Sequence, residues 1–314
     1  MSTGERFATN VSRGPDQALA LELVRVTEAA AIAAGRWVGR GERGSGEAAA
    51  TVAMYEHLMS APLRGVVVIG RGGRSDSPVL CAGDAVGFGD GPVCDVAVSV
   101  GDGALSADED VPSSVAAIAV AEHGALFAPP SSQVVERLAI GSEYADAVDI
   151  TRPVAENLRA VAAAKGVRVS ELVVAVTDGL RDRELADEIC GAGARLQVLA
   201  GGDVMGAVAA AHPESAVDVA WGTAGAAEAV VAAAALSCMG GSLQVRLRCD
   251  GSDEVLRTRD LVRDGRVLFI ATGVTTGELL RGVRYPTGRT TTESMVLCSA
   301  PDTAWTIGSE QRQR

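Results

Sequence analysis

The sequence is poor in lysine, in aromatic residues and in closely spaced cysteines. Lys165 is the only lysine, so arginine supplies almost all of the positive charge. Aromatic residues make up 3% of the 314 residues, so small and branched aliphatic side chains must build the core. The six cysteines include no C-x-x-C pair, which argues against a zinc site and favours free buried thiols in a reducing cytoplasm.

Several segments and motifs with specific functions are also missing. Residues 1–14 are polar and lack the apolar region of a signal peptide, so we expect a flexible N-terminus. The alanine-rich run 224–236 contains Glu228, which indicates a buried helix and not a membrane span. The chain has no G-x-x-x-x-G-K-[ST] motif, and no Ser-His-Asp or Cys-His set can be assigned.

The charge of the chain restricts its partners. The net charge is −12 and the pI is about 4.8, which argues against a nucleic acid or an anionic membrane as a partner. Local arginines can still bind a small anion. The hydrophobic fraction of 47% and the mean hydropathy of +0.20 indicate a globular protein with a sizeable core.

The length allows one large domain or two packed subdomains. The pattern of apolar residues changes near residues 145–151. We therefore expect an N-terminal α+β subdomain over 15–150 that carries most metal-site positions. A C-terminal α/β subdomain over 151–304 would carry the sugar-phosphate contacts, and residues 305–314 would form a loose polar tail.

Hydrophobic periodicity predicts the main elements. Leu19, Leu23, Val26 and Ala30 repeat at helical spacing after Pro15 and Asp16, which predicts a helix to about residue 34. Beyond residue 151, strands alternate with helices, which favours a mainly parallel sheet. Helices are expected at 15–34, 48–58, 151–165, 183–190, 203–211, 226–236 and 276–281, and strands at 65–70, 95–98, 115–121, 172–176, 194–199, 217–221, 243–248, 267–271 and 295–298.

Chemistry is expected where buried strands end in glycine-rich turns. The run DVAVSVGDGA at 95–104 reads as a buried strand that enters such a turn, and α/β proteins often place active sites at this position. The segments 222–225, ahead of Glu228, and 271–275 are further glycine- and threonine-rich turns that could offer N–H groups to an anion. Helix capping is the plain alternative for both segments.

Short motifs in unchanged order resemble the class II (GlpX-type) fructose-1,6-bisphosphatase family from Leu21 to about Ser299. They are RVTEAA at 25–30, WVGRG at 37–41, the strand that begins at Asp95, ENLR at 156–159, GDV at 202–204, ATG at 271–273 and TTE at 291–293. The resemblance implies an α/β fold, a layered α-β-α-β-α sandwich of the sugar-phosphatase (lithium-sensitive phosphatase) type, and a homo-oligomer.

The resemblance also implies a divalent metal centre with altered ligands. Family members hold Mg²⁺ or Mn²⁺ with acidic side chains, and Glu47, Asp102 and Glu228 occupy such positions here. Ser99 and Arg71 stand where the family has acids, and Ala104 stands where it has threonine. A guanidinium about 4 Å from a cation costs about 4 kcal/mol per unit charge at an effective dielectric constant of ~20.

The expected substrate contacts are fewer than in the family. By resemblance, Arg43 and Arg181 face the phosphates of a sugar phosphate, and Asp203 contacts a sugar hydroxyl. The two glycine-rich turns add Gly222, Thr223 and Thr275 as candidate binding residues.

Three hypotheses follow for this expected cytoplasmic homo-oligomer. The first is a diverged family member that binds or acts on a phosphorylated sugar with a degraded Mg/Mn site, or with no metal. In it Asp102, Glu47 and Glu228 serve as acid or base, and Arg71 faces the phosphate. The second is a functional metal-dependent phosphatase that converts fructose 1,6-bisphosphate to fructose 6-phosphate in gluconeogenesis. The third is a non-catalytic ligand-sensing or partner subunit.

Overall fold

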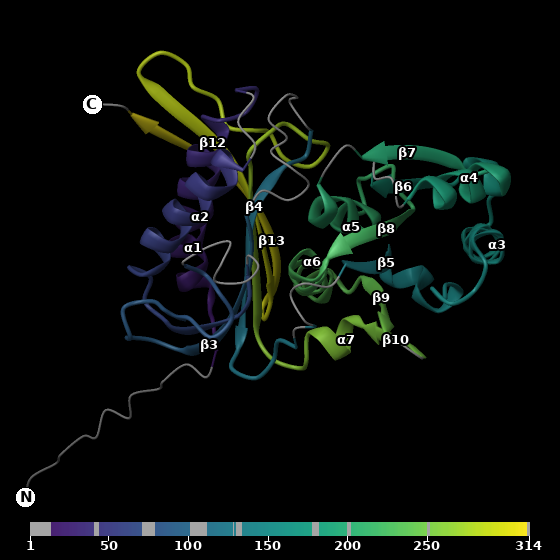
Figure 1. Cartoon of the computed structure of the whole chain (residues 1–314), viewed down its shortest axis with the longest axis horizontal. Coiled ribbons are helices and arrows are strands. Elements are labelled where there is room, and N and C mark those ends of the chain that lie inside the picture. Colours follow the sequence, from purple (N-terminus) through teal and green to yellow (C-terminus); the bar gives the residue numbers. More distant parts are fainter. Residues whose placement is uncertain are drawn as a thin grey trace, which may run out of the picture.

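The fold is a mixed α/β arrangement of two sheets with helices outside and between them (Figure 1). The computed structural model describes residues 14–40, 44–70, 79–100, 112–127, 129, 134–177, 182–199, 202–249 and 252–312. Every structural statement below refers to these residues.

The first sheet has seven strands in the order β13-β12-β11-β4-β3-β1-β2. Only β1 and β3 run parallel, and the other neighbours are antiparallel. Buried branched and small side chains fill β3 and β4, so both faces of the sheet centre are covered. The strands are β1 (Arg64–Ile69), β2 (Ala85–Val86), β3 (Val93–Val100), β4 (Val115–Glu122), β11 (Val267–Gly273), β12 (Arg289–Ser299) and β13 (Asp302–Arg312).

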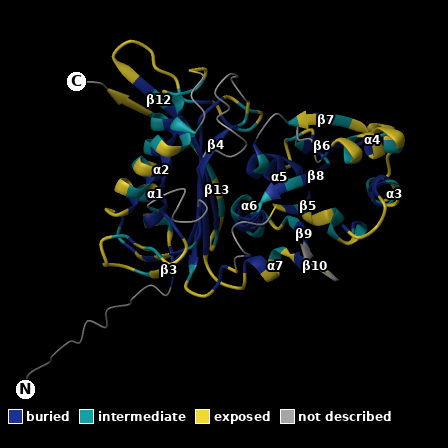
Figure 2. Ribbon diagram, in the orientation of Figure 1, coloured by how far each residue is buried: buried dark blue, intermediate teal, exposed yellow. Residues whose placement is uncertain are grey.

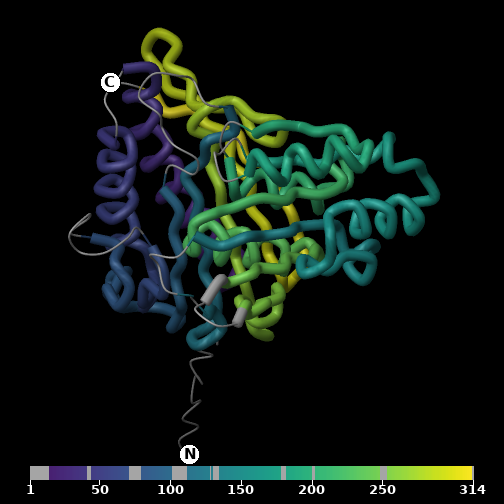
Figure 3. The backbone as a smooth tube through the Cα atoms, turned by 45° about the vertical axis from the view of Figure 1, so that its right-hand side comes forward, coloured from purple at the N-terminus to yellow at the C-terminus, as the bar shows by residue number. Residues whose placement is uncertain are grey.

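Helices α1 (Gln17–Gly35) and α2 (Ser45–Leu58) cover the outer face of this sheet. Asp16 caps α1 by accepting a hydrogen bond from the N–H of Leu19 at 3.1 Å, as expected for an N-cap aspartate. The predicted apolar face of α1 is buried. Figure 3 shows these N-terminal helices beside the C-terminal strands, so the two ends of the sequence pack against each other.

The second sheet has six strands in the order β10-β9-β5-β8-β6-β7. The pairs β6–β7 and β6–β8 are parallel, and the remaining pairs are antiparallel. The strands are β5 (Val134–Ile140), β6 (Val173–Thr177), β7 (Arg195–Leu199), β8 (Val219–Gly225), β9 (Ser242–Cys249) and β10 (Ser252–Arg257).

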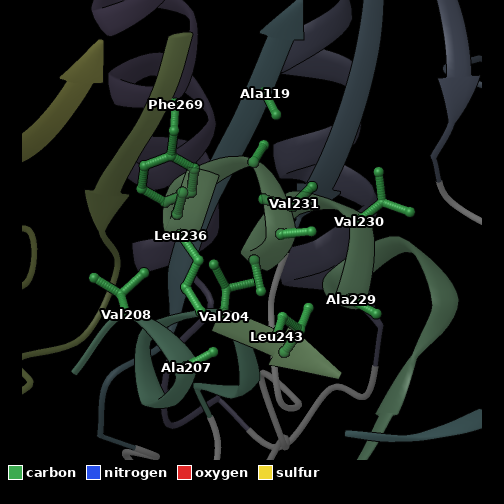
Figure 4. Close-up of a cluster of buried hydrophobic side chains, with 14 of the residues drawn as sticks. Ala119, Val204, Ala207, Val208, Ala229, Val230, Val231, Leu236, Leu243 and Phe269 are labelled. Atoms are coloured by element: carbon green, nitrogen blue, oxygen red, sulfur yellow. The ribbon is translucent and has the colours of Figure 1, made fainter. Parts of the chain in front are cut away.

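Helices α5 (Asp203–Ala211) and α6 (Ala226–Met239) lie between the two sheets. Figure 4 shows Val204 and Val208 of α5, Leu236 of α6 and Phe269 of β11 in one apolar cluster. The run of alanines lets α6 pack on both sheets at once, because no long side chain holds the layers apart.

Helices α3 (Val154–Lys165) and α4 (Arg183–Gly191) lie against the far side of the second sheet, where Figure 2 shows more exposed surface. Gly166 ends α3 in the left-handed conformation, as its sequence position predicts. Shorter elements are the 3₁₀ turns Ser142–Ala147 and Val169–Glu171 and the helix α7 (Thr258–Leu261).

Three structural expectations are wrong. The sheets are mixed and mostly antiparallel: in the second sheet β5 pairs antiparallel with β8, and β9 and β10 continue that antiparallel order, so only β6, β7 and β8 are parallel. Residues 276–281 form no helix. Residues after Ala304 are not a loose tail, since β13 pairs with β12 as far as Arg312.

Five cysteines have described side chains, and all of them are free thiols. Four of the five are buried, and Cys190 is exposed. Burial raises the pKa of Cys94 and of Cys238 to about 12, so both thiols stay protonated and unreactive at neutral pH. Within the described chain, no helix has the length and apolar character that a bilayer span requires.

Candidate active site

The first part of the site joins the first sheet to the central helices. Ser99, near the end of β3, is 1% exposed, and its hydroxyl donates a hydrogen bond to Oε1 of Glu228 at 3.3 Å. Glu228 lies in the first turn of α6. Its Oε2 would be 2.1 Å from a Cβ at residue 225, so Gly225 leaves room for this carboxylate. Burial raises the pKa of Glu228 above its ordinary value, and the hydrogen bond from Ser99 opposes that rise.

The second part of the site is built around a buried arginine. Arg137 of β5 is 3% exposed, and its guanidinium donates to the backbone carbonyl and to Oδ1 of Asp203, the latter at 3.3 Å. Thr177, at the end of β6, also donates to Oδ1 of Asp203, at 2.8 Å. Nε of Arg137 is buried and has no hydrogen-bond partner among the described residues. Asp203 is thus fixed at the start of α5 by a charged and a neutral donor.

The third part of the site is a buried aspartate between β6 and α4. Asp182 is 3% exposed and accepts hydrogen bonds from the N–H of Thr223 at 3.0 Å and from its hydroxyl at 3.1 Å. A Cβ at Gly222 would lie 3.3 Å from Oδ2 of Asp182, so the glycine lets the carboxylate approach β8. Burial raises the pKa of Asp182, and the hydrogen bonds from Thr223 lower it in part.

The charged side chains of the three parts of the site interact electrostatically. The charge of Asp203 raises the pKa of both Asp182 and Glu228, and the charge of Arg137 lowers both. The site therefore gathers three carboxylates, from the starts of α4, α5 and α6, around one buried cation. Such an arrangement favours bound cations and hydroxyl-rich ligands over a bare anion.

A cleft of about 880 Å³ reaches Asp182 and Thr223 from the outer side of the second sheet. Its lining includes Glu136, Trp221 and Arg246. The carboxylate of Glu136 accepts one hydrogen bond from the indole N–H of Trp221 and another from the guanidinium of Arg246. The cleft lies on the side of α3 and α4, away from α5 and α6.

Comparison with known proteins matches residues 17–311 to the model of the family described as "Bacterial fructose-1,6-bisphosphatase, glpX-encoded". The chain is 33% identical over 308 residues to the class 2 fructose-1,6-bisphosphatase of Haemophilus influenzae, covering 90% of this chain and 92% of that protein. It is also 33% identical over 305 residues to fructose-1,6-bisphosphatase 1 class 2 of Escherichia coli K12, covering 89% and 90%.

The chain belongs to the class 2 fructose-1,6-bisphosphatase family. The match spans both sheets and all the helices of Figure 1. The resemblance noted in the sequence is thereby confirmed at the level of the family, a group of phosphatases of carbohydrate metabolism.

The structure brings together only some of the residues that the family resemblance singles out. Ser99 meets Glu228, and Asp203 lies in the same charge cluster. Glu47 is half-buried in the first turn of α2. Arg43, Arg71, Asp102, Ala104 and Arg181 lie outside the described residues.

The glycine-rich turns differ from expectation. Gly222 and Thr223 belong to strand β8 and not to a turn before α6. The backbone N–H and the hydroxyl of Thr223 both donate hydrogen bonds to Asp182. Thr275 is 6% exposed, and its hydroxyl accepts a hydrogen bond from the N–H of Ser114 at 3.0 Å. It borders a separate, mostly apolar cavity of about 320 Å³ beside α5. Gly225 ends β8 and is the N-cap of α6, so this segment passes from strand to helix without a separate turn, and residues after Thr275 form no helix.

Arg137 and Asp182 are the site residues that sequence reasoning missed. Arg137 is the one charged residue on the inward face of an otherwise apolar strand, between Val135 and Ala139, and a buried strand position seldom holds an arginine without a partner. The signal depends on recognising residues 134–140 as a strand, which the sequence pattern did not predict. Asp182 carried no comparable signal, because it follows a polar run.

The described residues supply two of the oxygen ligands that a divalent cation would need. No group of three or more histidine, cysteine, aspartate or glutamate side chains among the described residues could hold a metal ion. Ser99 Oγ and Glu228 Oε1, however, lie 3.3 Å apart. This is the hydrogen bond between the two side chains, and it brings together two oxygen atoms of the kind that Mg²⁺ takes as ligands.

Proposed function

We propose that this family member is a metal-dependent phosphatase that converts fructose 1,6-bisphosphate to fructose 6-phosphate in the cytoplasm. The observation that carries the proposal is family membership over almost the whole chain, with two class 2 relatives each 33% identical. The contact between Ser99 and Glu228 supports it, because it places two oxygen atoms together, and hard cations bind oxygen ligands.

In this proposal Glu47, Asp102 and Glu228, with the hydroxyl of Ser99, hold Mg²⁺ or Mn²⁺. A bound cation would supply Lewis-acid activation of water and of the phosphoryl oxygens. Asp203 accepts a hydrogen bond from a sugar hydroxyl, and Arg137 and Thr177 hold that carboxylate in place. In the proposal Arg43 and Arg181 face the phosphates, and Arg71 binds one of them through its guanidinium.

The test is phosphate release by the purified protein. We expect release from fructose 1,6-bisphosphate with millimolar Mn²⁺ or Mg²⁺ and none with EDTA. Glu228→Gln should abolish the release, whereas Asp90→Asn, at an exposed loop position, should leave it unchanged. An absence of release with either metal across a panel of sugar bisphosphates would contradict the proposal.

A second candidate is a diverged enzyme or binding protein with a weakened metal site. It is favoured by the neutral hydroxyl of Ser99 beside Glu228, where the family resemblance implies a carboxylate. Ser99→Asp separates the two candidates. If the site is weakened, the variant should need at least tenfold less Mn²⁺ for half-maximal activity. If the native site is already competent, the metal requirement should change little.

The ligand-sensing subunit makes a different prediction in the same experiments. It predicts that fructose 6-phosphate raises the melting temperature although no phosphate is released with any metal. Turnover that depends on metal would exclude it.

A further inference from the structure

β13 forms one edge of the first sheet. It pairs with β12 from Ser299 opposite Asp302 to Arg289 opposite Arg312 without a change of register, and no described strand pairs with its other side. None of its 11 residues is fully buried, and exposed and half-buried positions alternate along it. Figure 1 shows the far ends of β12 and β13 extending past α1.

This edge lacks the features that normally protect a free strand. Natural sheets protect their edges with short strands, lysine, proline or bulges, because unpaired N–H and C=O groups recruit further strands. β13 is long and regular, and it contains no lysine and no proline. Its charges lie at the ends, at Asp302, Glu310 and Arg312, and the centre is uncharged. The opposite edge, β2, has only two residues.

We propose that β13 pairs antiparallel with β13 of a second copy of this chain, with Ile307 at the two-fold axis. An axis perpendicular to the sheet keeps side chains on their own face, so each residue lies opposite the one equally far beyond Ile307. Asp302 then faces Arg312 of the second copy at both ends of the interface. Opposite charges placed directly across two strands attract.

Other registers are less favourable. With the axis at Thr306, Asp302 lies opposite Glu310, and like charges meet. With the axis at Gly308, Arg312 lies opposite Ala304, and Asp302 and Thr303 have no partner within β13 of the second copy. The axis at Ile307 alone pairs the full strand and matches the charges.

The apolar side chains support the same register. Trp305 and Ile307 are half-buried on the face that packs against the core beneath α1. Pairing at Ile307 places the two isoleucines side by side at the centre of the interface. The apolar layer beneath α1 then continues from one copy into the other, which covers surface that one copy leaves half exposed.

The proposal is tested by charge exchange at the ends of β13, read out by sedimentation velocity at micromolar concentration. We expect the native chain to sediment as a dimer or an even-numbered assembly. Asp302→Arg and Arg312→Asp should each raise the dissociation constant roughly tenfold, because two equivalent pairs turn from attractive to repulsive. The double variant should restore the native value.

Restoration has one explanation. Ten residues of strand separate positions 302 and 312 by about 33 Å within one chain, so the two side chains can meet only between copies. Asp90→Arg makes the same change of charge in a loop next to β2, at the opposite edge of the sheet, and should leave the assembly unchanged. A monomeric native chain, or a double variant no better than the single ones, would overturn the proposal. The result is independent of whether the protein releases phosphate.

Discussion

At the scale of single residues, Arg137 determines the charge balance of the site. It is the one described cation that lowers the pKa of both Asp182 and Glu228, and it binds Asp203 directly. Burying a guanidinium is unfavourable unless carboxylates surround it, and bringing three buried or half-buried carboxylates together is unfavourable without a cation. Each group therefore makes the burial of the others possible.

Replacing Arg137 should destabilise the protein and impair substrate binding together. We expect Arg137→Met to lower the free energy of unfolding by about 3 kcal/mol, because it removes a buried guanidinium and leaves the half-buried Asp203 without its charged partner. Arg137→Lys keeps the charge and should lose about 1 kcal/mol, since a lysine cannot donate to both oxygens in the same way. Urea denaturation measures both values.

The control for this series is Arg159→Met, at an exposed position of α3, which should change the free energy of unfolding by less than about 0.5 kcal/mol. If Arg137→Met proves as stable as the native chain, the buried guanidinium does not compensate these carboxylates.

Asp182 should make the stability depend on pH in a defined direction. Its pKa is raised by burial from the ordinary value of 3.8, so the folded state holds a proton that the unfolded state releases as the pH rises through this range. The contribution of this group to stability therefore falls as the pH rises from about 4 through the raised pKa, and then stays constant.

Asp182→Asn removes this titration. We expect the stability of the variant relative to the native chain to rise as the pH rises from about 4 through the raised pKa of Asp182, in urea titrations with EDTA present. Groups that do not interact with Asp182 cancel in the difference between the two proteins. A difference that is flat or falls over this range would show that burial does not raise the pKa of Asp182.

At the scale of elements, helices were predictable and several strands were not. The helix α5 was predicted at its observed bounds, and α1 and α3 were close. Asp16 marks the start of α1, Gly166 marks the end of α3, and a continuous apolar run marks α5. β5 was missed because Glu136 and Arg137 interrupt its apolar run, and β13 because its alternation has few large apolar residues. Strand pairing depends on distant residues, so the local sequence could not reveal the antiparallel order.

The start of α5 links the two sheets through a glycine. Gly202 has φ of 79° and caps α5, and a Cβ on it would lie 2.8 Å from both Cβ and the carbonyl oxygen of Ser113, just before β4. Gly166 at the end of α3 has a similar φ of 69°, but a Cβ there would meet nothing within 4 Å.

The two glycines therefore form a matched pair. Gly166→Ala should cost about 1 kcal/mol from the left-handed conformation alone. Gly202→Ala should cost about 2 kcal/mol more, because Ser113 must also move. Chemical denaturation of both variants gives the comparison, and equal losses would show that the contact with Ser113 carries no energy.

At the scale of the whole molecule, α6 connects the two sheets. Its alanines are buried against β3 and β11 on one side and against β9 and β5 on the other. The sequence identified this run as a buried helix but could not show that it separates two sheets, because that depends on how β11–β13 return to the first sheet. The site shares this property: Ser99 comes from the first sheet and Arg137 from the second.

The shared helix predicts that both sheets unfold in one transition. Trp221 lies in the second sheet and Trp305 in the first, and Trp37 is the remaining tryptophan. Two variants that each keep only one of the sheet tryptophans, the others being replaced by phenylalanine, report the sheets separately. In each variant the fluorescence transition in urea should coincide with its own circular dichroism transition.

Ala233→Leu, at a fully buried position of α6, should lower the stability reported by both probes by the same amount, about 1–3 kcal/mol, because the longer side chain forces the layers apart. If the fluorescence of Trp305 and of Trp221 changed at urea concentrations different from the circular dichroism signal, the two sheets would fold as separate units and α6 would belong to only one of them.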